Sequence, residues 1–395
     1  MKYLKFLYIP VALMLLACVY EPEPFEAEVV ESTNQGDVVA VNVGQQICNP
    51  SVSQDTANYP GALLWLNFTK LSVKVKPADT AAYTMKRIVQ HDRLTVTDTS
   101  NTVRWFLMRD TSAKECQFQD PEWSTHPNYL VALRGYDVGG SKACDDLDYG
   151  IFAVRMSDKK KFWFYEKNII EEATPHLWVD PSAELDTSSA LADSTIEGFF
   201  GTKNVRLVYV SKKDEIVFVD FGAANGDFKK ALGKAMTLKK PSDRSSWTTE
   251  SPMISPDGNY VVYNMMESST HWESYVQELG ENTSPVLVES SKGGTSEPAQ
   301  PHWFQFGSRL FVLWAEFPSG SNFVNRADLS QASVQNGSAG RTMMREISLL
   351  PGVPADLLWL GDAYEIAPVP MIGGRSPDGK FLVTGTNYGF VLELP

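Results

Sequence analysis

The sequence predicts an all-β protein, a six-bladed β-propeller preceded by a lipoprotein signal peptide and a flexible tether. Three observations lead to this fold: a corner word that recurs along the chain, strand runs that follow its copies, and an N-terminus that reads as an export signal. We expect residues 1–17 to form the signal peptide, residues 18–40 the lipidated cysteine with a disordered acidic tether, and residues 41–395 the propeller.

The N-terminus has the pattern of a secretory signal. Lys2 and Lys5 precede an apolar stretch, Phe6 to Ala17, that is too short to span a bilayer. The stretch leads directly into Cys18 as Leu-Leu-Ala-Cys, which resembles the lipobox of bacterial lipoproteins, where the thiol is diacylated. An ordinary signal peptide with an incidental cysteine is the alternative. We expect Cys18 to carry acyl chains that hold the mature protein on a membrane, because two chains give stable anchoring.

The segment after Cys18 predicts a tether and a location. Residues 19–28 are rich in proline and glutamate, a composition that keeps a linker extended and unpacked. Val19, rather than an aspartate, follows the cysteine, which in enterobacterial lipoproteins is compatible with sorting to the outer membrane. We therefore expect a lipid-anchored protein of the cell envelope, on the outer membrane and facing either the periplasm or the surface.

Composition and charge exclude several classes of protein. With 43% hydrophobic and 21% charged residues, the chain can bury a large core and is not mainly disordered. The formal charge is −13, and it becomes −15 when residues 1–17, with two lysines and no acid, are removed. Because binding to a phosphate backbone depends on clustered cations, we expect no nucleic-acid partner.

The corner word is Ser-Pro-Asp-Gly, found at Ser255–Gly258 and again at Ser376–Gly379. In it, proline fixes φ, aspartate can accept from the backbone two residues on, and glycine accepts a left-handed conformation. A run of aromatic and aliphatic residues follows each copy. The word therefore predicts a hairpin corner that leads into a buried strand.

Degenerate copies extend the repeat to six units, which start near residues 53, 124, 201, 255, 306 and 376. The strand run after each corner is apolar at successive positions, as expected for a strand buried between neighbouring sheets. Radial repetition of such sheets is typical of propellers. A β-sandwich is the alternative fold, but it would need no corner word repeated at these intervals.

The corner word before a buried strand resembles that of TolB-type β-propellers, over about residues 45–395. More narrowly, Cys48–Ser53 and Trp123–Pro127, together with the lipobox, resemble a family of lipoproteins paralogous within fibre-degrading bacteria. The resemblance implies a TolB-type propeller lipoprotein, and neither match implies a catalytic residue. The third and fifth units depart from the pattern, because they lack the Pro-Asp pair.

Candidate ligand contacts come from tryptophans and histidines that lie close together near the unit starts. Flat aromatic rings suit contact sites, and a neutral imidazole can ligate a divalent ion. The simpler alternative is that these side chains fill space at blade junctions. The candidates are Trp123, His126, His176, Trp178, His302 and Trp303. We expect no catalytic residue, no resident metal and no cofactor.

Three cysteines remain after Cys18, an odd number for an oxidising compartment. Cys116 and Cys144 bracket the first strand pairing of the second unit and are the disulfide candidates, with Cys48 to Cys116 as the alternative pairing.

These observations favour a non-catalytic envelope lipoprotein, attached to a membrane by its acyl chains, whose propeller binds a protein or glycan partner. Two alternatives stay open. One is a metal-dependent, lyase-like propeller enzyme that acts on polysaccharide, which would need several imidazoles to converge on a metal. The other is a purely structural envelope component.

Overall fold

The structure is a computed structural model that describes residues 38–68, 70–84, 88–139, 144–184, 191–268, 271–290, 296–318, 340–348, 359–384 and 389–394. The chain divides into two compact units, Met1–Asn34 and Gln35–Pro395, and the described residues all belong to the second. The predicted signal peptide, Cys18 and the tether up to residue 37 lie outside the described residues, so they stay predictions. Within the described part of the chain, no helix has the length and apolar character needed to cross a membrane.

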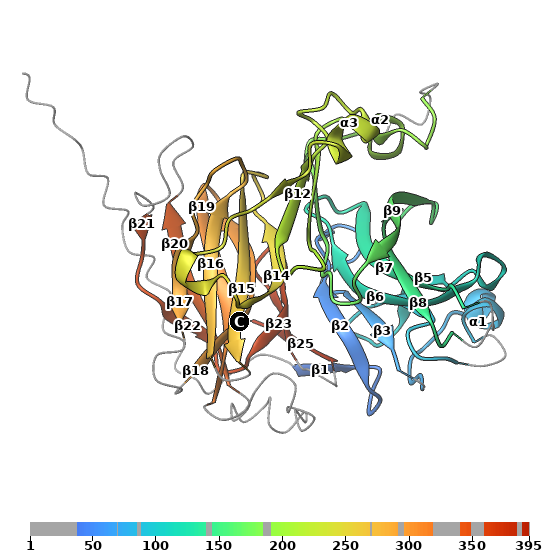
Figure 1. Ribbon diagram of the computed structural model, residues 1–395. Coiled ribbons are helices and arrows are strands. Elements are labelled where there is room, and N and C mark those ends of the chain that lie inside the picture. The colour runs from blue at the N-terminus through green and yellow to red at the C-terminus, as the bar shows by residue number, and fades with distance from the viewer. Residues whose placement is uncertain are drawn as a thin grey trace, which may run out of the picture. The chain divides into compact units, whose positions relative to one another are not determined.

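The described strands form six antiparallel sheets, named blades 1 to 6 here (Figure 1). Blade 1 contains β2 (Ile47–Val52), β3 (Leu63–Asn67), β4 (Arg93–Thr97) and β5 (Val103–Met108). Blade 2 contains β6 (Glu115–Trp123), β7 (Tyr129–Asp137), β8 (Leu147–Arg155) and β9 (Lys161–Ile169). Blade 3 contains β10 (His176–Val179), β11 (Val205–Val210), β12 (Ile216–Asp220) and β13 (Met236–Thr237).

The remaining three blades complete the set. Blade 4 contains β14 (Thr248–Ile254), β15 (Tyr260–Ser268), β16 (His271–Glu278) and β17 (Val286–Ser290). Blade 5 contains β18 (Ser296–Phe306), β19 (Arg309–Pro318), β20 (Arg341–Ser348), β21 (Trp359–Leu360) and β22 (Tyr364–Ala367). Blade 6 contains β23 (Met371–Arg375), β24 (Phe381–Thr384), β25 (Gly389–Glu393) and β1 (Val38–Val41).

Short helices occupy connections between strands. They are α1 (Pro77–Tyr83), α2 (Ile196–Phe200), α3 (Phe228–Leu232) and the 3-10 turns η1 (Thr111–Ala113) and η2 (Ser242–Arg244). The side chain of Thr195 accepts from the Gly198 N–H at the start of α2, and the helix ends at Gly201 with a φ of 72°. Apolar side chains of α2 and α3 join one cluster between blades 2 and 3, and both helices lie beyond the end of β12 (Figure 1).

The blades close into a ring through their first strands. The strands β2, β6, β10, β14, β18 and β23 each contact the next, and β23 contacts β2. Blade 6 is assembled from both ends of the second unit, because β1 pairs with β25 from Val38 opposite Leu392 to Val41 opposite Gly389 (Figure 1). The prediction of an all-β, six-bladed propeller is confirmed.

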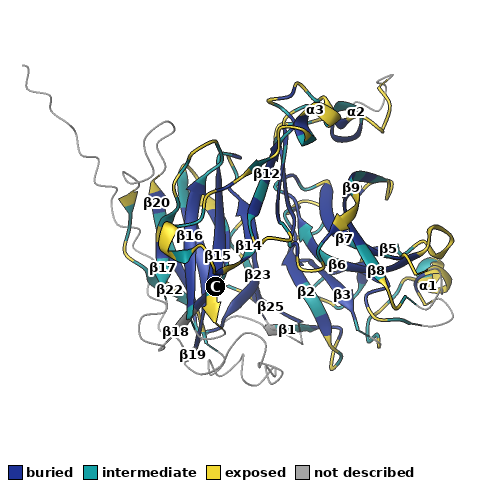
Figure 2. Ribbon diagram, in the orientation of Figure 1, coloured by how far each residue is buried: buried dark blue, intermediate teal, exposed yellow. Residues whose placement is uncertain are grey.

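The six largest apolar clusters of the described residues lie one at each blade junction. On β7, for example, Leu130 packs toward blade 1 and Val131 toward blade 3, and both side chains are fully buried. Figure 2 shows this burial along the strands. Successive apolar residues in the second strands therefore serve two junctions, and no blade can bury its faces without its neighbours.

The corner words have the geometry expected from their residues. In blade 4, Gly258 N–H donates to the Ser255 carbonyl at 2.8 Å, and Asn259 N–H donates to Asp257 Oδ1 at 3.1 Å. Gly258 has a φ of 78°, and a Cβ added there would lie 2.6 Å from the Trp178 ring of blade 3. Glycine is thus required at this position for two reasons: the backbone has a left-handed conformation, and the Trp178 ring leaves no room for a Cβ.

The six predicted corners each lie between the first and second strands of a blade. The two units without a Pro-Asp pair differ for separate reasons. In blade 3 the connection is long and includes α2, whereas in blade 5 Phe306 and Arg309 enclose a tight turn with Gly307 at a φ of 58°.

Candidate functional site

Each blade has a residue with positive φ in its first strand or, in blade 3, two residues before that strand. In five blades this residue lies within a register shift of the strand, typical of a β-bulge, and it re-aims the side chains around it. We call these residues the inner ring: Asn49, Asp120, Thr174, Ser251, Gln300 and Gly374, with φ values of 46°, 43°, 40°, 51°, 52° and 87°. A proline follows each of the first five.

Hydrogen bonds connect the inner ring from blade to blade. Asn49 Nδ2 of blade 1 donates to Asp120 Oδ1 of blade 2, and Thr174 N–H donates to Asp120 Oδ2 at 3.1 Å. Ser251 N–H of blade 4 donates to Thr174 Oγ1 at 3.2 Å. The Gln300 N–H of blade 5 donates to the side chain of Asn264 in blade 4 at 2.7 Å. The residues with positive φ therefore supply polar groups that hydrogen-bond neighbouring blades to one another.

Half-buried carboxyl groups of blades 2 and 4 lie around this ring. Burial, reinforced by Glu172, raises the pKa of Asp120 to about 7 against the effect of the Thr174 donor. Burial raises the pKa of Glu122 to about 8, although its Oε1 accepts from Ser51 Oγ. Burial and the nearby Glu172 raise the pKa of Glu250 to about 7. These carboxyl groups are therefore partly protonated near neutral pH. A cation placed beside them would favour their ionised forms.

No ion pair among the described residues includes Asp120, Glu122 or Glu250. Glu172, in the connection from β9 to β10, is exposed and acts on both Asp120 and Glu250. Carboxyls from blade 2, blade 4 and the start of blade 3 therefore influence one another's ionisation. We call Asp120, Glu122, Glu172 and Glu250 the acidic group.

Two predicted imidazoles also lie on the first strands. His176 and His302 are each 7% exposed, and both come two residues after a member of the inner ring. Burial and the neighbouring His302 lower the pKa of His176 to about 3, and burial lowers that of His302 to about 4. The Ile254 N–H donates to His176 Nδ1 at 3.0 Å. Both rings are neutral at physiological pH.

The other predicted contacts lie at the corners and junctions. Trp123 is 1% exposed and Trp178 is 8% exposed, and their indole N–H groups donate to the carbonyls of Pro127 and Pro256. Trp303 donates to the Met253 carbonyl at 2.7 Å, and His126 Nε2 lies 3.1 Å from the Ala183 carbonyl. The structure places these four residues in separate junctions, and a ligand contact for any of them stays a prediction.

In the described parts of the chain, no group of three His, Cys, Asp or Glu side chains is placed to hold a metal ion. The structure joins Cys116 and Cys144 in a disulfide with an S–S distance of 1.98 Å, and Cys48 is a free thiol.

The acidic group and the inner ring were not singled out from the sequence. A signal for them exists: Asn-Pro, Asp-Pro, Thr-Pro, Ser-Pro and Gln-Pro dipeptides stand at positions 49, 120, 174, 251 and 300, once in each of the first five blades. The dipeptide varies in its first residue, so a search for one fixed word passes over it. No local sequence pattern predicts where Glu172 and Glu250 lie in the folded protein.

The closed ring and its polar lining define a six-bladed β-propeller. No protein-family model matches the sequence, and no curated protein matches it. Among solved structures, TolB from Acinetobacter baumannii is 12% identical with a TM-score of 0.44, covering 85% of this chain. The chain spans 64% of the length of that protein.

Two further structures show the same level of similarity. A putative TolB from Agrobacterium tumefaciens is 11% identical with a TM-score of 0.43, and the match covers 91% of this chain and 99% of that one. An oligogalacturonate lyase in complex with manganese is 11% identical with a TM-score of 0.40, covering 89% and 78%. Similarity at this level carries no inference about function.

Proposed function

We propose that the protein is a non-catalytic binding propeller, attached to the cell envelope at the outer membrane by acyl chains on Cys18, and that its acidic group receives a basic segment of a partner protein. The observation that carries the binding proposal is that carboxyl groups from three successive blades influence one another's ionisation, with no cation from the described residues paired to Asp120, Glu122 or Glu250.

The argument for a cationic partner is electrostatic. A buried carboxylate without a counter-charge is costly, and the raised pKa values of Asp120, Glu122 and Glu250 express that cost. A lysine or arginine side chain placed among them would stabilise the ionised forms. The formal charge of −13 acts in the same direction, since a negative field attracts a basic segment before contact.

We expect a pentalysine peptide to bind the purified protein more tightly as the pH rises through about 7, because the carboxyl groups with raised pKa values ionise there. The Glu250→Gln variant should bind this probe about tenfold more weakly and lose part of the pH dependence, because Asp120 and Glu122 still ionise near neutral pH. Isothermal titration calorimetry over a series of pH values measures both effects.

The matched control is Asp214→Asn, which removes the same charge in an exposed turn where Asp214 has a φ of 57°, a conformation that asparagine tolerates. Equal binding by Glu250→Gln and Asp214→Asn, or an affinity that falls with rising pH, would remove the acidic group as the binding site.

The attachment is tested separately in the producing cell. We expect Cys18→Ala to move the protein from the outer-membrane fraction to the soluble envelope or culture fraction, and to abolish incorporation of labelled palmitate, because the thiol is the attachment atom. The Cys48→Ala variant, which removes a free thiol inside the propeller, is the control. Unchanged fractionation and labelling of Cys18→Ala would contradict the lipoprotein assignment.

A further inference from the structure

A cavity of about 340 Å³ lies between blades 3 and 4, on the side of the corner words. Its walls come from the start of β11, the end of β12 with the turn after it, and the corner before β15. The side chains that matter are Asn204, Arg206, Asp220, Asp257 and Asn259, with Trp178 among the lining residues. This volume is near the lower end of the roughly 300–1,000 Å³ range of small-molecule sites.

The polar groups of this cavity are held in place by both blades. Arg206 Nε donates to Asp220 Oδ2 at 3.1 Å within blade 3, and Arg206 Nη1 donates to Asn259 Oδ1 at 3.1 Å in blade 4. The guanidinium carbon also lies 5.1 Å from the centroid of the Trp178 ring. Asn259 Nδ2 in turn donates to Asp257 Oδ2 at 3.0 Å. A preformed arrangement of this kind loses little conformational entropy on binding.

This hydrogen-bond network leaves unused hydrogen-bonding capacity on the side chains that line the cavity. A carboxylate has about four lone-pair sites, and the hydrogen bonds donated by Arg206, Ala223, Ser255 and Asn259 use only part of those on Asp220 and Asp257. Asn204 donates through Nδ2 to Asp180 at 3.2 Å, which leaves its side-chain oxygen to accept from a ligand. Planar carboxylate, amide and guanidinium groups match neighbouring hydroxyl groups, which each donate and accept.

Charge selects among hydroxylated ligands. Arg206 is compensated by Asp220, and Asp257 adds one negative charge, so the cavity as a whole is negative. An anionic sugar such as a uronate, or a phosphate, would meet repulsion there. Gly222 and Ala223 form one wall with little side-chain bulk, which leaves room for a ring.

We propose that this cavity binds a neutral hexopyranose unit of a glycan. The site is separate from the acidic group, which lies at the inner ring, so the two proposals stand or fall independently.

The test uses methyl glucoside, methyl galactoside and methyl mannoside as probes, with methyl glucuronide as the anionic comparison. Binding to the full mature protein is measured by saturation-transfer NMR and titration. We expect at least one neutral glycoside to bind, and the glucuronide to bind at least about tenfold more weakly than that glycoside. Absence of binding by all three neutral glycosides, or equal binding of the glucuronide, overturns the proposal.

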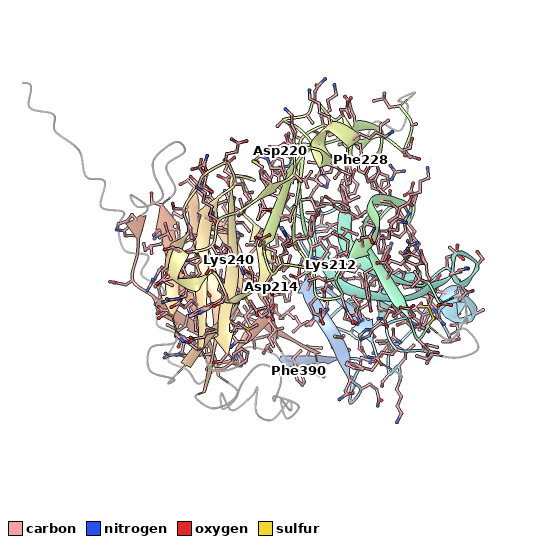
Figure 3. The ribbon with its side chains drawn as sticks, in the orientation of Figure 1. Lys212, Asp214, Asp220, Phe228, Lys240 and Phe390 are labelled. Atoms are coloured by element: carbon pink, nitrogen blue, oxygen red, sulfur yellow. A yellow bond between two sulfur atoms is a disulfide. The ribbon has the colours of Figure 1, made fainter. Side chains whose placement is uncertain are left out.

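Ala223→Trp fills the cavity without removing a hydrogen bond of its walls, and it should weaken glycoside binding by about tenfold or more. The control is Lys212→Trp, which adds the same side chain at the opposite end of the β11–β12 hairpin, where Figure 3 shows Lys212 and Asp214 away from Asp220. Far-UV circular dichroism and a cooperative thermal unfolding transition report that each variant is folded. Glycoside binding that persists in folded Ala223→Trp places the sugar elsewhere and overturns the assignment.

Discussion

Gly258→Ala is expected to lower the free energy of unfolding by about 3 kcal/mol. The left-handed φ of 78° accounts for about 1 kcal/mol of this loss, because a Cβ is disfavoured there. The rest comes from the new methyl group, which would lie 2.6 Å from Cε2 of Trp178. The indole cannot easily retreat, since its N–H donates to the Pro256 carbonyl at 2.9 Å, so the corner itself must shift.

Gly307→Ala separates the two causes. Gly307 also has a left-handed φ, of 58°, but nothing lies within 4 Å of the position a Cβ would take. Only the conformational effect of about 1 kcal/mol should remain in this variant. Urea unfolding followed by tryptophan fluorescence measures both variants. Equal losses for the two glycines would show that the close approach of blade 3 to the blade 4 corner is not a constraint.

Removing β1 should have the largest effect, roughly 3–5 kcal/mol, together with a tendency to aggregate. Without Val38–Val41 the strand β25 loses every pairing on one side and becomes an open edge. The junction between blades 6 and 1 also loses Val41, which is 2% exposed. Losing buried valine and several ladder hydrogen bonds accounts for an effect of this size.

The comparison is between one chain that begins at Val38 and another that begins at Asn42, whose side chain still bonds the Ser72 N–H in blade 1 at 2.6 Å. Calorimetry gives the change in Tm, and size-exclusion chromatography detects association. A synthetic β1 peptide should bind the shorter chain and restore its Tm. The same Tm for both chains would mean that β1 does not hold the ring closed.

Local chemistry explains which parts of the fold the sequence could predict. The corner at Ser255–Gly258 is specified by residues next to one another, so the proline, aspartate and glycine predict it without knowledge of the rest. Apolar residues on both faces of a strand, such as Leu130 and Val131, indicate burial between two sheets. The pairing of Val38 with Leu392 joins segments that are far apart in the sequence. Neither segment contains a local pattern that predicts its pairing partner.

The candidate site could be predicted less well, because burial is a property of the whole ring. Trp123 and His302 were singled out as residue types that make contacts, and the sequence could not show that one lies in a junction and the other beside the inner ring. The Xaa-Pro dipeptides were visible, but only the register shifts show what they do. Glu250 became a candidate through its burial and the charge of Glu172.

Because β1 pairs with β25, the sixth blade is complete only when both of these distant segments are present. A nascent chain that stops before Gly389 leaves Val38–Val41 without a strand to pair with, even when the other blades have formed. Such a product keeps an unpaired strand edge, which is open to association with other chains and to proteolysis.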